Sequence, residues 1–386
     1  MPRRILVVTS WYPHEHSPVS GIFIRDQVEV LSRRYQVSVY APLPVPWKAL
    51  AFPSRIPRRG FNSESGIPVF RDPVLLPMRL AGPAAMAWLY RGMHRRLRDL
   101  TAAWGRPDII HAHVCLPGGW LATRIGREWN VPVVLTEHAG PFASLLRSRG
   151  QRGLVQQVVD GARRLLAVSP ALAREIEDAF PGATVGVLGN VIRTDFFTPA
   201  DAGSGDGQQE KLICTIALLN PGKGIDVLLE AVRILRDRGQ ERFRVIIGGD
   251  GPERRRLEGM VASEALQRRC QFTGLLDRDG VRALLRRSDI FVLPSLGETF
   301  GVALGEAMAC GKYVVATRCG GPEYVIAPGS GVLVDKGDAL QLADALEKAL
   351  NDSDADLATR ARQSIDRRFG PDAFLGNVSS IYAALQ

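Results

Sequence analysis

The stretch Ile290–Glu306, which reads IFVLPSLGETFGVALGE, decides the fold of this chain. It opens with an uninterrupted apolar run, passes through a loop that contains Pro, Ser and Gly, and continues as a second apolar segment through Gly311. A short apolar run without alternation is typical of a parallel strand covered on both faces, and the longer segment favours a helix. The stretch therefore predicts a strand-loop-helix unit with Glu298 in its loop and Glu306 in its helix.

The same unit recurs along the whole chain. The first half has strand candidates at Arg4–Ser10, Gln36–Ala41, Asp108–Val114, Pro132–Glu137, Arg164–Val168 and Thr184–Leu188. The second half has them at Leu212–Leu219, Arg244–Gly248, Gln271–Gly274, Ile290–Pro294, Tyr313–Thr317 and Gly331–Val334. Helix-spaced segments such as Ile225–Asp237, Glu253–Glu264, Asp279–Arg287 and Ala339–Leu350 lie between them. Repeated β-α-β units predict a doubly wound α/β sheet in each half, with ligands outside the carboxyl ends of the strands.

The length of 386 residues suits two domains. The segment Pro199–Gly207 is small, polar and Gly-rich, as linkers are. We therefore predict a first domain at 1–198, a linker at 199–210, a second domain at 211–370, and a last helix at 371–386 that packs back on the first domain.

The five cysteines are scattered and form no C-x-x-C pair, which argues against a disulfide framework and a structural zinc site. No apolar stretch reaches the roughly 18 residues of a membrane helix, and the short run Ile5–Val8 favours a buried first strand over a signal peptide. These observations predict a reducing, cytoplasmic location.

The net charge of +9 is carried by one half of the chain. Residues 1–200 hold 25 Lys and Arg against 14 Asp and Glu, whereas residues 201–386 hold 24 against 26. Basic and apolar residues alternate in clusters at Trp47–Phe61 and Trp88–Arg98. Such clusters attract an anionic membrane surface or an acidic substrate, and a solvated arginine-rich surface is an equally good interpretation.

The helix that begins near Phe300, Gly301 and Val302 offers unpaired backbone N–H groups, which favour phosphate. The carboxylate of Glu306, two turns into that helix, can accept both hydrogen bonds of a ribose diol. Glu298, in the preceding loop, can hold hydroxyls of a sugar. This spacing predicts a nucleotide-sugar site.

Three other positions follow strands and so share the ligand-binding edge. Lys223 lies between two glycines after the strand that ends at Leu219, where its charge can neutralise a diphosphate. Gly21 precedes a helical pattern and lets backbone N–H groups approach a phosphate, although a simple turn explains it equally well. His138 follows an apolar strand and can bond a sugar hydroxyl. His111 and His113 share one strand face and are interpreted as structural.

Taken together, these motifs resemble the retaining glycosyltransferases of family 4, which have the GT-B fold of two Rossmann-like domains facing a cleft. The most specific element is Glu298-x7-Glu306 within its Pro-Ser and Glu-Thr-Phe-Gly context. Supporting matches are Gly249–Glu253, Phe272–Gly274, Gly320–Glu323, Gly189–Ile192, Ser20–Phe23 and Thr136–His138.

The resemblance implies roles for individual residues. Glu306 would hold the ribose, Glu298 the donor sugar, Gly301 and Val302 the diphosphate, and Lys223 a phosphate. The catalytic residues would be His138, Glu298 and Lys223. The donor-binding set would be Gly21, Asn190, Lys223, Leu276, Glu298, Phe300, Gly301, Val302 and Glu306.

One position departs from the family pattern. The family usually has an arginine five residues before the lysine, and this chain has Leu218 there. The loss removes a bidentate phosphate contact and puts full catalytic competence in question. The Asp-x-Asp strings at Asp277–Asp279 and Asp352–Asp356 lie at a helix start and in a linker, so no metal and no cofactor is expected.

The leading hypothesis is transfer of a hexose-type sugar from a UDP- or GDP-sugar to a surface polysaccharide or lipid-linked glycan, at the inner face of the plasma membrane. The expected partners are the nucleotide-sugar, the acceptor glycan and an anionic membrane surface, with no nucleic acid. Two alternatives remain open: a catalytically weak nucleotide-sugar binder, and a phosphorylase or epimerase on the same architecture.

Overall fold

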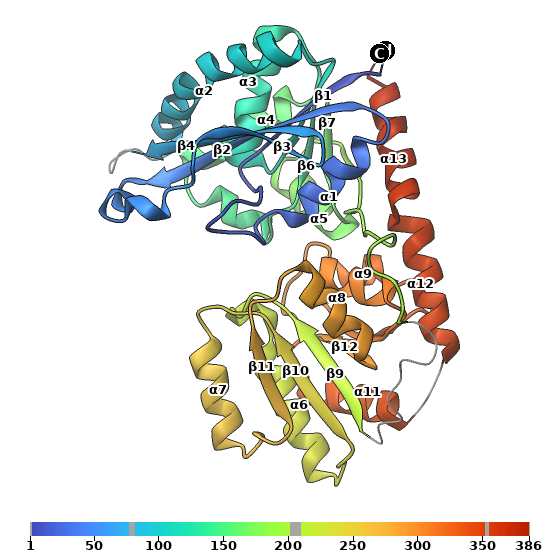
Figure 1. Ribbon diagram of the computed structural model, residues 1–386. Helices are drawn as coiled ribbons and strands as arrows, with labels where there is room; N and C mark the ends of the chain where they lie inside the picture. Colours follow the sequence, from blue (N-terminus) through green and yellow to red (C-terminus); the bar gives the residue numbers. More distant parts are fainter. Residues whose placement is uncertain (1, 77–81, 201–209, 352–354, 386) are drawn as a thin grey trace. The chain divides into compact units, whose positions relative to one another are not determined.

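A computed structural model describes residues 2–76, 82–200, 210–351 and 355–385 (Figure 1). The chain divides into two compact units. The first unit comprises Met1–Val191 and Phe374–Gln386, and the second comprises Ile192–Ala373. Each is a sheet with helices on both faces, so the predicted α/β class with a sheet in each half is confirmed.

The first unit is built on an eight-stranded sheet. In spatial order its strands are β3 (Gly60–Glu64), β4 (Ile67–Leu76), β2 (Gln36–Pro46), β1 (Arg4–Thr9), β5 (Ile109–His113), β6 (Val133–Glu137), β7 (Arg164–Ala167) and β8 (Val185–Val187). All pairs are parallel except the edge pair of β3 and β4. The central strands are buried throughout, as a parallel sheet covered on both faces requires.

Helices cover both faces of this sheet. They are α1 (Ile22–Leu31), α2 (Gly82–Trp104), α3 (Trp120–Trp129), α4 (Arg149–Gly161), α5 (Pro170–Ala179) and α13 (Pro371–Ala383). Short turns of 3-10 helix, η1 (Trp47–Ala51) and η2 (Pro53–Arg55), follow β2. On one face α1 and α13 form a core with β1 and β2, and α2, α3 and α4 contact each other and the sheet on the other (Figure 1).

The second unit has a six-stranded parallel sheet. In spatial order its strands are β11 (Cys270–Gly274), β10 (Phe243–Gly248), β9 (Lys211–Ile216), β12 (Ile290–Leu293), β13 (Tyr313–Arg318) and β14 (Val332–Asp335). Its helices are α6 (Ile225–Asp237), α7 (Arg254–Ser263), α8 (Arg278–Arg287), α9 (Val302–Ala309), α10 (Pro322–Val325), α11 (Ala339–Asn351) and α12 (Ala355–Phe369). One apolar core joins α6, α7 and α11 to the sheet.

Both sheets change the direction in which strands are added. In the second unit the chain adds β10 and β11 on one side of β9, and then adds β12, β13 and β14 on the other. In the first unit the same reversal lies between β1 and β5. Open parallel sheets bind ligands beyond the carboxyl ends of the strands at such a point. The topology therefore directs attention to the loops after β1, β5, β9 and β12.

The boundary between the units precedes the predicted one at residues 198 and 199, because the segment after Val191 bonds to α12. The Ile192 N–H donates to the Phe369 carbonyl oxygen at 2.8 Å, and the Arg362 guanidinium donates to the Phe197 carbonyl oxygen at 3.1 Å. The predicted linker falls largely on residues 201–209, which lie outside the described residues.

Every strand predicted from the sequence is present, but β3, β4 and α2 were not predicted. Strand β4 contains Pro68 and Pro73, and proline argues against an interior strand because it cannot donate to a neighbour. The basic cluster Trp88–Arg98 lies on α2, whose buried positions are Leu89, Met93, Leu97 and Leu100. Arginines between those positions masked the helical spacing in the sequence.

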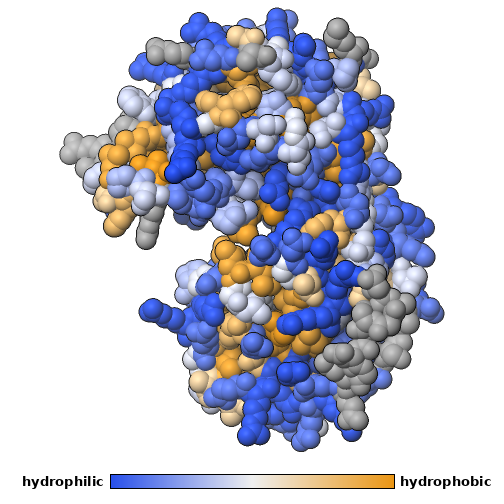
Figure 2. Space-filling model, viewed as in Figure 1, coloured by the Kyte–Doolittle hydropathy of each residue, from blue (hydrophilic) through white to orange (hydrophobic). Residues whose placement is uncertain are grey.

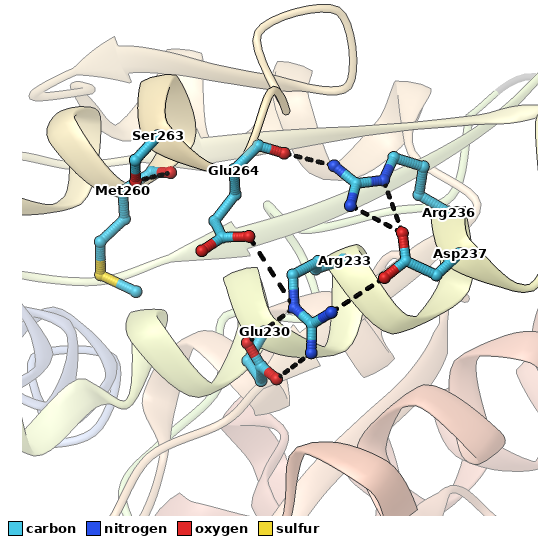
Figure 3. Close-up of polar contacts among 7 residues, drawn as sticks. All are labelled: Glu230, Arg233, Arg236, Asp237, Met260, Ser263 and Glu264. Atoms are coloured by element: carbon cyan, nitrogen blue, oxygen red, sulfur yellow. Dashed lines mark hydrogen bonds and ion pairs between the residues drawn. The ribbon is translucent and has the colours of Figure 1, made fainter.

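An ion-pair network ties α6 to the residue that follows α7 (Figure 3). Arg233 contacts Glu230 at 2.6 Å and Asp237 at 2.8 Å, and its Nε lies 3.9 Å from Glu264 Oε2. Arg236 pairs with Asp237 at 2.6 Å and donates to the Glu264 carbonyl oxygen. Solvent screens these partly exposed charges, so the apolar core beneath them contributes most of the stability of this helix pair.

The last helix is fixed to the first sheet through a buried hydroxyl. Tyr382 Oη lies 2.6 Å from His111 Nδ1, and His111 Nε2 lies 2.8 Å from Thr136 Oγ1. We predict that Tyr382→Phe lowers the free energy of unfolding of the first unit by about 1–3 kcal/mol, because it leaves a buried ring nitrogen without its partner. All six tryptophans lie in the first unit, so tryptophan fluorescence during urea denaturation reports on that unit alone.

Tyr35→Phe is the matched control for this experiment. The Tyr35 hydroxyl donates to Ser379 Oγ at 2.8 Å in a partly exposed position, where water can replace the lost bond. We expect a smaller loss there. Equal losses for the two variants would contradict the buried bond as the cause.

Candidate active site

The loops after β9 and β12 are in direct backbone contact at the strand-order reversal of the second unit. The Leu296 N–H donates to the Gly222 carbonyl oxygen at 2.8 Å. Gly224 has a φ of +61°, and a Cβ built on it would lie 2.1 Å from the Pro294 carbonyl oxygen. Only glycine combines this left-handed backbone with so close an approach. The contact fixes Lys223 against the loop that carries Glu298.

Lys223 and Glu298 form an ion pair within this contact. Lys223 Nζ lies 2.6 Å from Glu298 Oε1, and Ser295 Oγ donates to the same oxygen at 2.9 Å. The exposed fractions of the two side chains are 25% and 13%, so water screens the pair only in part. An ammonium group has three N–H donors, and Lys223 therefore keeps capacity for a second anion beside the carboxylate.

Helix α9 begins at this place without a side-chain cap. Its N-cap is Gly301, with φ of 92°, and a glycine has no side chain with which to cap the helix. By contrast, Asp277 caps α8 by accepting from the Gly280 N–H at 2.8 Å. The open N–H groups at Gly301 and Val302, with the helix dipole, favour an anion at this end of α9.

Phe300 contributes its backbone and not its side chain to this edge. The ring is 1% exposed and packs against Phe369 and Tyr324, with centroid separations of 5.1 and 6.4 Å. A Cβ built on Gly321 would lie 2.4 Å from the Phe300 nitrogen, so the loop after β13 presses against the start of α9. The family resemblance implied that Phe300 contacts the donor. Because its ring is buried in the core, only its backbone can make such a contact.

Three other predicted donor-site residues lie along the same edge. Glu306 is half-buried in the second turn of α9, and Val302 is half-buried at its start. Leu276 is half-buried after β11, where its Cδ1 lies 3.0 Å from a Cβ built on Gly248 at the end of β10. Leu218 is 59% exposed after β9, so its side chain is not needed by the core.

In the first unit His138 follows β6 and belongs to a stack of buried imidazoles. Its Nε2 lies 2.9 Å from His113 Nδ1, and its ring lies 4.9 Å from that of Phe23. The ring of His113 stacks in turn on His111 at 4.5 Å. Burial, with the neighbouring His111, lowers the pKa of His138 to about 3. His138 is therefore a neutral imidazole at neutral pH and can bond a hydroxyl but not act as a cation.

Asn190 lies beside His138 and not in the second unit. It is 3% exposed, and its Oδ1 accepts from Gln27 Nε2 at 2.9 Å. Asn190 opposes, in part, the effect of burial on the pKa of His138, whereas its predicted contact to the donor remains a prediction. His111 is structural as predicted, because both ring nitrogens have partners.

Gly21 begins α1 with a φ of +65°. A Cβ there would lie 2.1 Å from the Trp11 carbonyl oxygen, which closes the loop after β1 on itself. The turn geometry alone explains this glycine. Gly21 has no side chain with which to cap α1, and the start of a helix favours an anion.

The sequence reasoning missed Glu137 and Val114. The fully buried Glu137 carboxylate accepts backbone N–H groups from Cys115, His138 and Ala139, each at 2.7 Å, and so ties together the loops after β5 and β6. Val114 has a φ of +65°, which is strained for a β-branched residue and is a mark of functional edges. In the sequence, only the position of Glu137 at the end of an apolar strand indicated that this residue has a special role.

A surface that we call the apolar–basic face lies at the far ends of β2 and β4. Its exposed apolar residues are Trp47, Leu50, Phe52, Leu75 and Trp88, with Lys48 beside Trp47 and Arg91 beside Trp88 and Leu75. Pro46 pairs with Leu76 across the two strands, and Trp88 Nε1 donates to the Leu75 carbonyl oxygen at 3.1 Å, so the segments adjoin. Figure 2 shows apolar atoms gathered at this end of the unit.

Comparison with known proteins decides the family. Residues 20–196 match Glycosyltransferase Family 4, and residues 199–367 match Glycosyl transferases group 1. A D-inositol 3-phosphate glycosyltransferase from Thermobispora bispora is 30% identical over 72% of this chain and 71% of its own length. The chain belongs to the family 4 glycosyltransferases.

Other relatives agree with this assignment. A putative teichuronic acid biosynthesis glycosyltransferase from Bacillus subtilis, TuaC, is 27% identical over 89% of this chain and 88% of its own length. The chain spans just under two thirds of two corynebacterial D-inositol 3-phosphate glycosyltransferases, at 66% and 63% of their lengths.

Solved structures identify the fold as GT-B. Sucrose-phosphate synthase from Thermosynechococcus elongatus superposes with a TM-score of 0.78 at 19% identity, over 100% of this chain and 99% of that chain. Anabaena HepE in complex with UDP-glucose superposes with a TM-score of 0.74 at 19% identity, over 100% of both chains.

The buried imidazoles predict an acid-sensitive first unit. Burial lowers the pKa of His111 and His138 to about 3 and also lowers that of His113, whereas each group titrates near 6.5 when unfolded. Above about pH 6.5 neither state is protonated and stability is full. Below it only the unfolded chain takes up protons, so stability falls by about 1.4 kcal/mol per pH unit per histidine until the folded pKa is reached.

Urea denaturation followed by tryptophan fluorescence, between about pH 7 and pH 5, measures this slope. His113→Asn removes one of the three groups and should make the slope shallower, even if it lowers the stability at neutral pH. An unchanged slope in this variant would mean that carboxyl groups cause the acid sensitivity.

Proposed function

We propose that this transferase moves a hexose-type sugar from a UDP- or GDP-sugar to a surface-polysaccharide or lipid-linked glycan acceptor, with retention of anomeric configuration and without a metal ion. The observation that carries the proposal is the convergence of Lys223, Glu298 and the uncapped start of α9 at the strand-order reversal of the second unit. Cation, carboxylate and open N–H groups are the complements of a diphosphate and a sugar.

Each group in the second unit meets one part of the donor. The N–H groups of Gly301 and Val302 and the Lys223 ammonium bind the diphosphate, whose negative charge grows as the sugar departs. Glu306 accepts from the two ribose hydroxyls, and Glu298 from hydroxyls of the donor sugar. Leu276 provides an apolar contact for the base. Lys223 then bridges Glu298 and the phosphate, which couples the position of the sugar to that of its leaving group.

The first unit supplies neutral groups for the sugar and its acceptor. His138, whose pKa of about 3 keeps it uncharged, bonds a hydroxyl near the reacting carbon, with Asn190 and His113 orienting the ring. The acceptor hydroxyl attacks on the face that the diphosphate leaves. The bond from the anomeric carbon to the phosphate oxygen breaks, a bond to the acceptor oxygen forms, and the hydroxyl proton passes to the departing phosphate. Gly21 offers an N–H to that phosphate.

The relatives support the choice of donor and acceptor. HepE is described in complex with UDP and with UDP-glucose, and TarM from S. aureus with UDP and a glycosylated glycerol. TuaC is named for teichuronic acid biosynthesis. These names favour a uridine nucleotide and a glycan acceptor.

The apolar–basic face supports a site of action at an anionic membrane on the cytoplasmic side. No described helix is long and apolar enough to cross a bilayer. Leu50 and Phe52 are 54% and 58% exposed in short turns beside Lys48, a combination that inserts side chains at the headgroup level while the cation meets anionic lipid.

Leu218 favours a second candidate, a nucleotide-sugar binder of low activity. Its exposed side chain occupies the position where the resemblance expects an arginine, and a leucine cannot contact phosphate. Incubation with the donor alone also tests the epimerase alternative, because an epimerase converts the donor without an acceptor.

The donor is tested by nucleotide binding. We expect UDP or GDP to raise the melting temperature, and Glu306→Ala to weaken the affinity for that nucleotide by roughly a hundredfold, because two charge-assisted bonds are lost. His138→Ala should keep the nucleotide affinity and lower turnover instead. Calorimetric titration of both variants measures the difference. A wild-type chain that binds no nucleoside diphosphate would refute the proposal.

The membrane claim is tested by sedimentation with vesicles. The chain should pellet with vesicles of phosphatidylglycerol and phosphatidylcholine at low salt, but not with phosphatidylcholine alone. The double variant Leu50→Ser, Phe52→Ser should remain in the supernatant. Leu340→Ser is the matched control, because Leu340 is also a leucine that is 54% exposed. Failure of the wild type to bind anionic vesicles would remove the membrane claim.

A further inference from the structure

Arg71 fixes the position of the loop that follows β1. This arginine is 9% exposed, its Nε and Nη2 donate to the Pro13 carbonyl oxygen at 2.9 and 2.7 Å, and its Nη2 lies 2.5 Å from Glu64 Oε1. Its guanidinium also lies 5.5 Å from the ring centre of Tyr12. Arg71 therefore fixes the first half of the loop, and Gly21 closes the second half on Trp11.

A cavity of about 600 Å³ lies between this loop, the first turns of α1, and β3 and β4. That volume falls in the range that binds small ligands. Strand register places the cavity at the ligand-binding edge. Val8 pairs with Tyr40, and Ala41 pairs with Arg71, so Arg71 lies level with the carboxyl end of β1.

The lining of the cavity has an excess of positive charge. Four arginines line it against two glutamates. The arginines are Arg25, Arg58, Arg59 and Arg71, and the glutamates are Glu15 and Glu64. This excess of positive charge favours an anionic ligand for those arginines whose hydrogen-bonding capacity is not already used.

Two of the four arginines are already paired. Arg71 is bound to Glu64 as described, and Arg59 donates to Asp72 Oδ1 at 3.1 Å and to the Pro73 carbonyl oxygen at 3.0 Å. These two guanidinium groups hold the walls of the cavity together. Their hydrogen bonds go to the protein itself, so a ligand has little to gain from them.

Arg25 and Arg58 keep hydrogen-bonding capacity. Arg25 forms an ion pair with Glu29, in which Nε and Oε1 are 3.8 Å apart, but this buried Nε has no hydrogen-bond partner among the described residues. Arg58 is exposed, and no contact of its guanidinium is found in the described part of the chain. Its backbone N–H, at 2.9 Å from Glu15 Oε1, fixes its position on the rim. A buried guanidinium donor without an acceptor is costly unless a ligand supplies one.

His14 adds a neutral donor to the same lining. The His16 N–H donates to His14 Nδ1 at 3.3 Å, which puts the ring proton of the neutral form on Nε2. Burial, with His16 and Arg71 nearby, lowers the pKa of His14 and keeps the ring neutral. The cavity thus offers two guanidinium groups and an imidazole N–H.

We propose that this cavity binds the anionic group of an acidic acceptor glycan, a phosphate or a carboxylate, through Arg25 and Arg58. The inference rests on the proposed function, in which the first unit receives the acceptor. Guanidinium forks match both anions in a bidentate geometry. The same loop and helix also carry Trp11 and Phe23, whose rings lie 6.5 Å apart, and Phe23 contacts His138. An acceptor glycan whose anionic group is bound in this cavity would have its sugar ring close to Phe23 and His138.

The first test uses small sugars in the absence of donor. Glucose, glucose 6-phosphate, glucuronate and inorganic phosphate are titrated into the full chain by calorimetry. We expect glucose 6-phosphate or glucuronate to bind at least about tenfold more tightly than glucose and than inorganic phosphate, with an affinity that falls as salt is added. The stronger of the two identifies phosphate or carboxylate as the group. Equal binding of glucose, or equal binding of inorganic phosphate, would overturn the proposal.

The second test assigns the site. Arg25→Gln and Arg58→Gln should each weaken binding of the preferred acid by about tenfold or more, and Arg25→Lys should fall between wild type and Arg25→Gln. Arg34→Gln, an exposed position outside the cavity with the same charge change, should bind like wild type. Arg58 is exposed, so its variant tests the site even if Arg25→Gln unfolds. A loss as large in Arg34→Gln would overturn the assignment.

UDP or GDP titrated into the same variants separates this inference from the proposed function. Nucleotide affinity should not change in Arg25→Gln or Arg58→Gln, and a parallel loss would assign the arginines to the donor and overturn the inference. If the wild type binds nucleotide but no sugar acid, the inference fails alone. If it binds the acid but no nucleotide, the proposed function fails instead.

Discussion

The arrangement of both units depends on where the chain reverses the order of its strands. β9 lies between β10 and β12, and β1 lies between β2 and β5, so consecutive connections leave the centre of each sheet toward opposite sides. All the central strands are parallel, and their carboxyl ends therefore meet at one edge. Because the carboxyl ends of neighbouring strands lie side by side, the loops that follow them can contact each other through their backbones. The contact between Gly222 and Leu296, with Gly224 against Pro294, is the result in the second unit.

The ligand-binding edges of the two units differ in charge. The second unit presents a lysine, two glutamates and an uncapped helix, which suit a diphosphate and hydroxyl groups. The first unit presents imidazoles that burial keeps neutral, fixed by Glu137, Asn190 and Tyr382. A neutral imidazole can hydrogen-bond a hydroxyl but does not attract an anion. The two edges therefore offer different chemistry to a ligand.

Most of the fold was readable because parallel strands that are covered on both faces must be apolar without alternation. The limits of α6, Ile225–Asp237, were predicted as they stand. β4 was missed because Pro68 and Pro73 lie within it, and α2 because arginines interrupt its buried leucines. The place of Glu298 and Glu306 in a loop and a helix start was readable because strand, loop and helix start are consecutive in the chain. Glu137 and the pairing of His113 with His138 were missed because they join residues from different strands.

The sequence by itself determined two α/β units, the strand-loop-helix that carries Glu298 and Glu306, and the positions of Lys223 and His138 at strand ends. These follow from local periodicity and from residue order, which need no knowledge of distant contacts. Only the tertiary structure decided that Lys223 pairs with Glu298, that Phe300 faces the core, that Asn190 bonds to Gln27, and that the buried Arg25 Nε makes no hydrogen bond within the described residues. These contacts depend on which loops the strand order brings together. The burial that results lowers the pKa of the three histidines and keeps them neutral.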